Sequence, residues 1–313
     1  MGIKKIETIT VVITNHNRPK IILPVIESII NQPLNDIAMD ILIIDDASTN
    51  QINPNDLKKY GEKVKLHRLS ENKGVHGARN IGIFLAKGEF VIIADDDDPF
   101  ISNSLQRAID LIISLNDYLK YPIFQLTRTN GRMPKYYILA NEKHFFEKVF
   151  KGDFTPIINK RVFLDNGFIY PEYEDIKQIG GEILLSYEIA GKFGIPTWNH
   201  TVAQLGDADT TINRLTNPNN WRLKAKQFAK LQELEMNYMR ERGFDKKYPD
   251  YYNFKAKGLF IYTLLDGKKK EGRKILKKHL YFSYFTTIIF LLISYLPAFI
   301  INILLKIYRK KST

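Results

Sequence analysis

Four consecutive aspartates, Asp95 to Asp98, are the residues whose type and spacing most directly indicate chemistry in this chain. They follow the apolar run FVIIA at 90–94 and therefore come at the carboxyl end of an expected buried strand. Adjacent carboxylates repel one another, and burying an unpaired one is costly. Mg²⁺ and Mn²⁺ bind carboxylate oxygens together with substrate phosphates. The cluster therefore indicates a site for a cation and a phosphate, with a solvated acidic turn as the alternative.

Two other expected strand ends also carry polar groups. The first ends in TNHNRP at 14–19 and the second in DDAST at 45–49. Each segment alone is explained as a turn or a helix N-cap. In a parallel sheet, however, these ends and the aspartates share one edge, where open α/β sheets bind ligands. Together they predict a nucleotide site. Neither a G-x-G-x-x-G motif after the first strand nor a Walker A motif is present, so a dinucleotide site or a P-loop is not favoured.

Alternating strand and helix signals position these residues. Strands are expected at 9–14, 40–45, 64–69 and 90–94, and helices at 21–30 and 76–86. This alternation predicts an α/β fold of βαβ units with a mostly parallel sheet and right-handed crossovers. Further along, we expect a strand at 123–127 and helices at 102–115 (with Ser102 as N-cap), 179–193, 221–242 and 254–265.

Composition and charge narrow the class of partner. The 313 residues include no cysteine, which excludes disulfides, thiolate nucleophiles and Cys-ligated zinc and fits a reducing compartment. The net charge of +12 would suit nucleic acid. Residues 266–313, however, contribute +9 of it, with 11 Lys/Arg against 2 Asp/Glu. Because these basic residues flank an apolar segment, an anionic lipid surface is favoured and no nucleic-acid partner is expected.

The apolar segment at 280–305 contains no charged residue over 26 positions and is long enough to cross a bilayer. Pro297 divides it, and basic residues flank both ends. We expect it to lie in, or dip into, the inner leaflet at the cytoplasmic face of the cell membrane, in preference to a true span. A buried core helix is the alternative.

The ordered motifs of the first hundred residues resemble family 2 glycosyltransferases of the GT-A fold. The resemblance rests on TVVIT, NRP, SIINQ, IIDDAST, ENKG, GARNIG and AKGEF, in that order and directly before the aspartates. It implies a Rossmann-like, mostly parallel sheet flanked by helices. A GT-A catalytic domain would occupy 1–215, with a nucleotide-sugar half at 1–100 and an acceptor half at 101–215. A helical extension at 216–278 and a hydrophobic membrane-associating segment with basic flanks at 279–313 would follow.

The resemblance also implies roles for single residues. The nucleotide-sugar pocket would be lined by Thr14, His16, Asn17, Asp46, Arg79, Asp95 and Asp96. Asp97, with or without Asp98, would hold Mn²⁺ or Mg²⁺ on the diphosphate, and the register within the four aspartates stays open by one position. His200 is a secondary candidate ligand, against a packing role, and Arg214 is a candidate clamp on the diphosphate.

In inverting members of the family, the catalytic base is a carboxylate at the start of a helix in the acceptor half. The segment GGEILLS at 180–186 resembles that region, with isoleucine at 183 in place of the usual aspartate, so Glu182 is the expected base. Glu174 and Asp175 are its rivals. The helix dipole would lower the pKa of Glu182 unless burial opposes it. An ordinary acid in a first helical turn is the alternative.

These features predict a metal-dependent inverting glycosyltransferase. It would move a sugar from a nucleotide-diphosphate donor, expected to be a UDP-sugar, to a hydroxyl of a glycan or lipid-linked acceptor in cell-surface polysaccharide synthesis. The alternatives are a sugar nucleotidyltransferase and a non-catalytic, membrane-bound nucleotide-sugar-binding protein. A nucleotidyltransferase usually has a glycine-rich loop after its first strand, and residues 14–19 contain no glycine.

Overall fold

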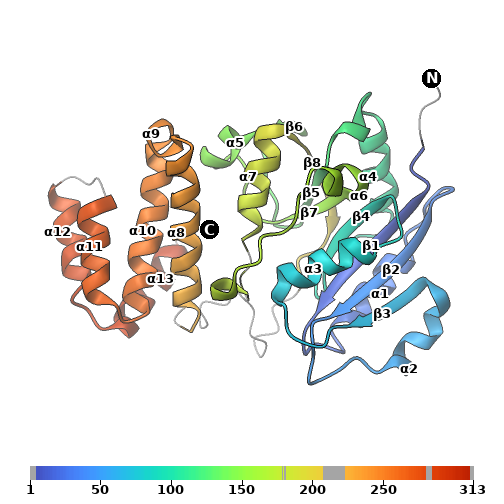
Figure 1. Cartoon of the computed structure of the whole chain (residues 1–313), viewed down its shortest axis with the longest axis horizontal. Helices are drawn as coiled ribbons and strands as arrows, with labels where there is room; N and C mark the ends of the chain where they lie inside the picture. Colours follow the sequence, from blue (N-terminus) through green and yellow to red (C-terminus); the bar gives the residue numbers. More distant parts are fainter. Residues whose placement is uncertain (1–4, 178, 180, 207–222, 280–283, 311–313) are drawn as a thin grey trace. The chain divides into compact units, whose positions relative to one another are not determined.

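The computed structural model describes residues 5–177, 179, 181–206, 223–279 and 284–310 (Figure 1). The chain divides into two compact units. The first comprises Met1–Glu172 and Glu182–Asp207, and the second comprises Tyr173–Gly181 and Ala208–Thr313. The first unit contains the sheet, whereas the described elements of the second are helical.

The first unit is built on one eight-stranded sheet with the order β3-β2-β1-β4-β7-β5-β8-β6. The strands are β1 (Thr8–Asn15), β2 (Ala38–Asp45), β3 (Val64–Arg68), β4 (Phe90–Asp95), β5 (Ile123–Arg128), β6 (Tyr137–Ala140), β7 (Phe154–Asn159) and β8 (Ile195–Ala203). Strands β1 to β4 are mutually parallel. Strands β7 and β6 are antiparallel to their neighbours. The expected parallel arrangement is therefore confirmed for β1 to β4, whereas the sheet as a whole is mixed.

Helices cover both faces of the sheet. Their bounds are α1 (Ile22–Ile30), α2 (Pro54–Leu57), α3 (Gly74–Leu85), α4 (Ser104–Ile113), α5 (Glu142–Phe146), α6 (Lys160–Asp165) and α7 (Glu182–Lys192), with 3₁₀ turns at Lys58–Lys63 and Tyr118–Lys120. Alternate side chains of β1 face opposite sides: Val11 and Ile13 pack with α1 and α4, whereas Val12 packs with α3, α6 and α7. Both faces are therefore buried, as the continuous apolar strand runs predict.

Helix α3 approaches the sheet unusually closely because Gly82 has no side chain. A Cβ built on Gly82 would lie 2.3 Å from Cγ1 of Val12, which is closer than real atoms approach. The glycine therefore lets the helix lie directly on β1 and β2. This position matters for the site, because α3 carries His76 and Arg79.

The second unit is a set of packed helices. They are α8 (Ala225–Glu241), α9 (Phe244–Lys247), α10 (Pro249–Leu265), α11 (Lys269–His279), α12 (Tyr284–Ile293) and α13 (Ala298–Lys310), preceded by a 3₁₀ turn at Glu174–Ile176. Phe260, Leu264, Leu276 and Ile301 are at the centre of its apolar core.

Some expected elements differ from those observed. Helix α4 begins at Ser104 after Asn103, whose φ of 59° is left-handed, so the Ser102 N-cap was wrong. Strands β6, β7 and β8 were not predicted. The uncharged run 280–305 forms two helices on either side of Pro297. Within the described ranges, no helix is both long and apolar enough to cross a bilayer.

Candidate active site

The polar strand ends meet at one edge of the sheet, as predicted. Asn15 pairs with Asp45 across β1 and β2, and Thr14 pairs with Asp95 across β1 and β4. Strands β4 and β5 are each antiparallel to β7 and therefore run in the same direction. Arg128, the last residue of β5, consequently joins the same edge as Asp95.

Asp95 and Asp98 are held by one buried arginine, Arg128. Its Nη1 donates to Oδ2 of Asp95 at 2.6 Å and also contacts Oδ2 of Asp98. Arg79 donates to the other oxygen of Asp95 at 3.0 Å, and the backbone N–H of Gly206 donates to Asp98 at 2.8 Å. Burial raises the pKa of Asp95, but the charges of Arg128 and Arg79 outweigh it and hold that pKa well below its usual range.

Asp96 and Asp97 share a second arginine, Arg18. Its two terminal nitrogens donate to Asp96 at 2.7 Å and to Asp97 at 2.6 Å. Asn15 adds a hydrogen bond of 2.7 Å to Asp96. Burial, reinforced by the negative charges of Asp97 and Asp95, raises the pKa of Asp96 to about 7 although Arg18 opposes the shift.

Arginines therefore neutralise the aspartate cluster, which is not the solvated acidic turn considered as the alternative. Four carboxylates face three guanidinium groups, those of Arg18, Arg79 and Arg128. We did not predict roles for Arg18 or Arg128 from sequence. The signal was available, because both follow or end expected strands at the edge that carries the aspartates.

His16, Asn17 and Asp46 are brought together at the ends of β1 and β2. Nδ1 of His16 lies 2.7 Å from the carbonyl oxygen of Asp46, which can only accept a hydrogen bond. Oδ1 of Asn17 accepts from the backbone of Thr49 and Asn50 at 2.8 and 2.9 Å. Asn17 itself has a left-handed φ of 59°. These side chains thus fix the loop that follows β2.

Asp46 anchors the first turn of α3. Its two carboxylate oxygens accept from the backbone N–H groups of Lys73 at 2.7 Å and Gly74 at 2.9 Å. Burial raises the pKa of Asp46 although these hydrogen bonds lower it. The side chain is buried and couples the end of β2 to the helix that carries Arg79.

Glu182, the first residue of α7, is paired with a histidine that sequence reasoning missed. Nε2 of buried His76 lies 3.1 Å from Oε2 of Glu182, and Nδ1 of His76 lies 2.8 Å from the carbonyl oxygen of Pro171. Although partial burial raises the pKa of Glu182, whose side chain remains 57% exposed, the hydrogen bond from His76 and the charge of Arg79 lower it overall. His76 precedes Arg79 by one helical turn, which is the sequence signal that it shares a face with that residue.

Carbonyl oxygens accept hydrogen bonds only, so Nδ1 of His76 carries a proton. The contact between Nε2 and Oε2 then requires one further proton, held by His76 as an imidazolium or by Glu182 as a carboxylic acid. The hydrogen bond from His76 and the charge of Arg79 lower the pKa of Glu182, which favours its carboxylate form. Glu182 and His76 therefore act as a coupled pair.

The remaining candidates make their described contacts with other residues. Glu174 and Asp175 belong to the second unit, where both are exposed and Glu174 pairs with Lys177 at 2.6 Å. Nε2 of His200 lies 3.0 Å from the backbone carbonyl of Ser104, which favours the packing role for this histidine. Arg214 lies outside the described residues.

The donor set is suited to a hard divalent cation shared with a phosphate ligand. Among the described residues, no three His, Asp or Glu side chains converge as a complete protein cage. Asp97 is more exposed than Asp96 and Asp98, with 15% of its side chain accessible, whereas Asp95 is 32% accessible but is held by two arginines. A single carboxylate combined with phosphate oxygens is a common way to hold Mg²⁺.

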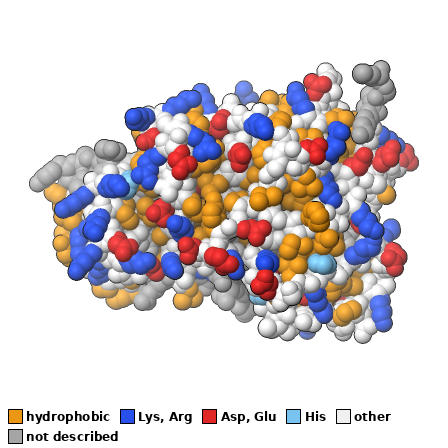
Figure 2. Space-filling model, viewed as in Figure 1, with side chains coloured by type: hydrophobic (Ala, Val, Ile, Leu, Met, Phe, Trp, Pro, Cys, Tyr) orange, Lys and Arg blue, Asp and Glu red, His pale blue; other side chains and the backbone are white. Residues whose placement is uncertain are grey.

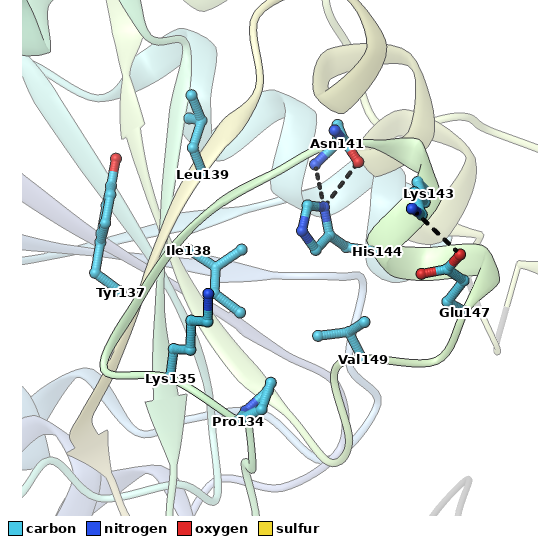
Figure 3. Close-up of a pocket in the computed structure, with 10 residues that line it drawn as sticks. All are labelled: Pro134, Lys135, Tyr137, Ile138, Leu139, Asn141, Lys143, His144, Glu147 and Val149. Carbon is cyan, nitrogen blue, oxygen red and sulfur yellow. Dashed lines mark hydrogen bonds and ion pairs between the residues drawn. The ribbon is translucent and has the colours of Figure 1, made fainter.

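A separate pocket of about 610 Å³ lies beside the edge strand β6 (Figure 3). Lys135, Ile138, His144 and Val149 surround it in this view. The pocket is lined by β6, by α5 and by the segments next to them, and it shares no residue with the aspartate cluster. It therefore lies outside the strand-end site.

Comparison with known proteins identifies the region that carries these motifs. The model of glycosyl transferase family 2 matches residues 10–160. The Escherichia coli protein WfgD, named as a UDP-Glc:alpha-D-GlcNAc-diphosphoundecaprenol beta-1,3-glucosyltransferase, is 24% identical over 171 residues, covering 53% of this chain and 66% of WfgD. Staphylococcus aureus TarS, named as a poly(ribitol-phosphate) beta-N-acetylglucosaminyltransferase, is 30% identical over 106 residues, covering 33% of this chain and 18% of TarS. The chain thus spans less than two thirds of these relatives.

A solved structure shares the fold. The crystal structure of TarS 1-349 in complex with UDP-GlcNAc aligns with a TM-score of 0.52 at 17% sequence identity, covering 88% of this chain and 93% of that one. This likeness confirms the GT-A-like arrangement of a mixed sheet flanked by helices.

Proposed function

We propose that this chain, whose residues 10–160 match the model of glycosyl transferase family 2, is an inverting glycosyltransferase that uses a nucleotide-diphosphate sugar. The observation that carries the proposal is the convergence of Asp95, Arg79 and Arg128 at the carboxyl edge of the sheet. A crevice at that edge is where such folds bind nucleotides. A UDP-sugar is the proposed donor, since TarS was crystallised with UDP-GlcNAc and WfgD is named for UDP-Glc.

The donor would lie across the ends of β1, β2 and β4. His16 and Asn17, with the loop after β2 that they fix, would form the base and ribose side. Asp46 would position α3 and, through it, Arg79. The three guanidinium groups of the cluster provide positive charge for the diphosphate, because arginine forks match phosphate oxygens.

Asp97 is the proposed metal ligand, with Asp98 less suited because it is buried against Arg128. A bound Mn²⁺ or Mg²⁺ would supply Lewis-acid stabilisation of the leaving diphosphate. Arg18, which bridges Asp96 and Asp97, would then move from Asp97 toward the phosphates. This exchange keeps the charge of the site balanced when the donor enters.

Glu182 is the proposed base. Its lowered pKa keeps the carboxylate charged at neutral pH, so it can accept the proton of the acceptor hydroxyl as that oxygen attacks the anomeric carbon. His76 would orient the carboxylate and stabilise its charge through the 3.1 Å contact. The acceptor hydroxyl would attack from the face opposite the leaving diphosphate, which inverts the anomeric configuration.

A glycan on a membrane lipid is the proposed acceptor, at the cytoplasmic face of the membrane. This assignment is supported by the diphosphoundecaprenol acceptor in the name of WfgD and by the positive charge of residues 266–313. Cell-surface polysaccharide synthesis is the corresponding proposed process.

Donor hydrolysis tests the reaction class. The purified chain with a UDP-sugar panel and Mn²⁺ or Mg²⁺ should slowly release free sugar and UDP, as measured by ion-pair chromatography. Release of pyrophosphate or a nucleoside monophosphate would instead indicate nucleotidyl transfer. Tight, metal-dependent donor binding without any turnover, even with lipid-linked acceptors, would indicate a non-catalytic binding protein.

A further inference from the structure

Exposed large apolar side chains are concentrated in one short stretch of the described residues, 288–307. Of the 19 exposed large hydrophobic residues among the described positions, nine lie between 288 and 307. They are Ile288, Ile289, Leu291, Leu292, Tyr295, Phe299, Ile303, Leu304 and Ile307. Scattered single apolar residues are normal on a surface, but so dense a group marks an interaction site.

The exposed residues follow helical spacing. Ile288, Leu291, Leu292 and Tyr295 stand at i, i+3, i+4 and i+7. On α13, Phe299, Ile303 and Ile307 recur every four residues. Ile301 of α13 is buried in the core of the unit, and Phe290 and Ile293 of α12 pack against that core. Each helix is thus apolar both where it meets the core and where it meets solvent, which in a water-soluble setting is unusual.

A basic helix adjoins this apolar surface. The Nζ of Lys269 donates to the carbonyl oxygen of Tyr295 at 3.2 Å, and the guanidinium of Arg273 lies 4.9 Å from the centre of the Tyr295 ring. The exposed face of α11 carries Lys270, Lys274, Lys277 and Lys278. Figure 2 shows basic side chains (blue) over α11 next to apolar side chains (orange) at the left edge, where α12 lies.

We propose that the exposed faces of α12 and α13, together with α11, form a surface that docks onto an anionic lipid bilayer, with both helices lying in the plane of the interface. Apolar side chains would enter the acyl boundary, and lysines would contact anionic headgroups. Tyr295 is 63% exposed and contacts both Lys269 and Arg273 of α11. It would therefore act as an aromatic residue at the membrane–water interface. This lipid-docking surface shares no residue with the proposed donor site, and it specifies which residues would bring about the membrane association that the proposed function includes.

Charge favours lipid over a second copy of the chain. Residues 266–313 carry a net charge of +9. In a two-fold dimer, the same patch occurs on both partners, so a self-contact through this surface would bring basic helices together. Like charges across an interface are costly, whereas anionic lipids neutralise them.

Vesicle flotation with the full chain tests the surface. The chain should bind vesicles containing phosphatidylglycerol much more tightly than neutral phosphatidylcholine vesicles, and binding should weaken as salt rises. The double variant Leu292→Glu with Phe299→Glu should reduce partitioning at least about tenfold, since both side chains are exposed and their burial in lipid would be lost. Phe84→Glu with Ile169→Glu, at comparably exposed positions in the first unit, is the matched control and should leave partitioning unchanged.

A variant of the exposed lysines of α11 tests the same surface without altering its apolar packing. Lys270→Gln, Lys274→Gln and Lys277→Gln together should weaken binding to anionic vesicles at least about tenfold while leaving the melting temperature near wild type. No binding to anionic vesicles by the wild-type chain would overturn the proposal. So would concentration-dependent dimers, seen by light scattering, that the Leu292 and Phe299 substitutions abolish. Vesicle binding requires no sugar transfer, so it is informative whether or not the proposed reaction holds.

Discussion

Nη1 of Arg128 lies 2.6 Å from Oδ2 of Asp95, although strand β7 separates their two strands in the sheet. The pair therefore crosses over the end of an intervening antiparallel strand. Both the arginine and Asp98, which it also contacts, are buried. This contact holds together the two parts of the sheet at the edge where the donor is proposed to bind.

Removing Arg128 should destabilise the fold strongly. Arg128→Met leaves the buried carboxylate of Asp98 and the partly buried carboxylate of Asp95 with fewer partners, and breaking the buried pair with Asp98 costs about 3–5 kcal/mol. Lys5→Met, which breaks an exposed pair with Asp36, should cost less than about 1 kcal/mol. Urea denaturation of both variants measures the difference, and equal losses would show that the Arg128 pair is not an important stabilising contact.

Asp97 and Asp98 should respond differently to substitution. Asp97→Ala should abolish transfer and metal-dependent donor binding while leaving the metal-free melting temperature unchanged or raised, because relief of like-charge repulsion offsets the lost ion pair with Arg18, which keeps Asp96 as a partner. Asp98→Ala should lower the metal-free melting temperature, because Arg128 and the Gly206 N–H lose an acceptor. Thermal scans with EDTA and with Mn²⁺ plus UDP separate these effects. The opposite pattern would move the metal ligand to Asp98.

Glu182→Gln should reduce turnover by about 10²- to 10⁴-fold and leave UDP affinity near wild type, because a general base acts on the acceptor hydroxyl. Glu174→Gln and Asp175→Asn are the matched controls and should retain turnover. Initial rates and UDP titration by calorimetry provide the two readouts. Near-normal turnover in Glu182→Gln, with a large loss in either control, would transfer the role to that residue.

Asp96 should make the metal-free protein less stable as pH rises toward 7. Its pKa is raised to about 7 in the folded chain, so between about pH 4 and 7 the folded state binds more protons than the unfolded state. Stability contributed by the protonated form is therefore lost with increasing pH. Asp96→Asn, which mimics that form, should raise the melting temperature at pH 8 in EDTA and change it little at pH 5.

Asp117→Asn, at an exposed position beside Lys120, is the control for this pH comparison and should give no such pH-dependent difference. A lower melting temperature of Asp96→Asn at pH 8 would mean that the ion pair with Arg18 outweighs the cost of burying the charge.

The strand-end architecture of the first hundred residues could be predicted because its signals are local. Buried parallel strands such as β1 and β4 are continuous apolar runs, and the polar groups that follow them are fixed by the direction of the strands. Strand β7 was missed because it contains Pro156 and pairs only with distant segments. The pairing of Arg128 with the aspartates was missed because it depends on long-range topology: β7 lies between β4 and β5 in the sheet.

The pairing of His76 with Glu182 illustrates the same limit in the site. Glu182 was predicted from its place at the start of a helix, whereas its partner is 106 residues away. Propensity and spacing describe one element at a time, and the packing of α7 beside α3 is a tertiary property. The apolar segment at 280–305 was predicted from composition, but its division into α12 and α13 depends on Pro297 and on the packing of Ile301.

The bridge from Arg128 to Asp95 has a consequence for protein engineering. Recombining the donor half of one relative with the acceptor half of another is an obvious route to hybrid enzymes with new acceptors. In this chain such a splice after residue 100 would separate Asp95 and Asp98 from Arg128, their shared cation at the end of β5. A hybrid whose grafted half lacks an arginine at that position would leave these carboxylates without their shared cation. The two halves should therefore be exchanged only when the grafted half supplies that arginine.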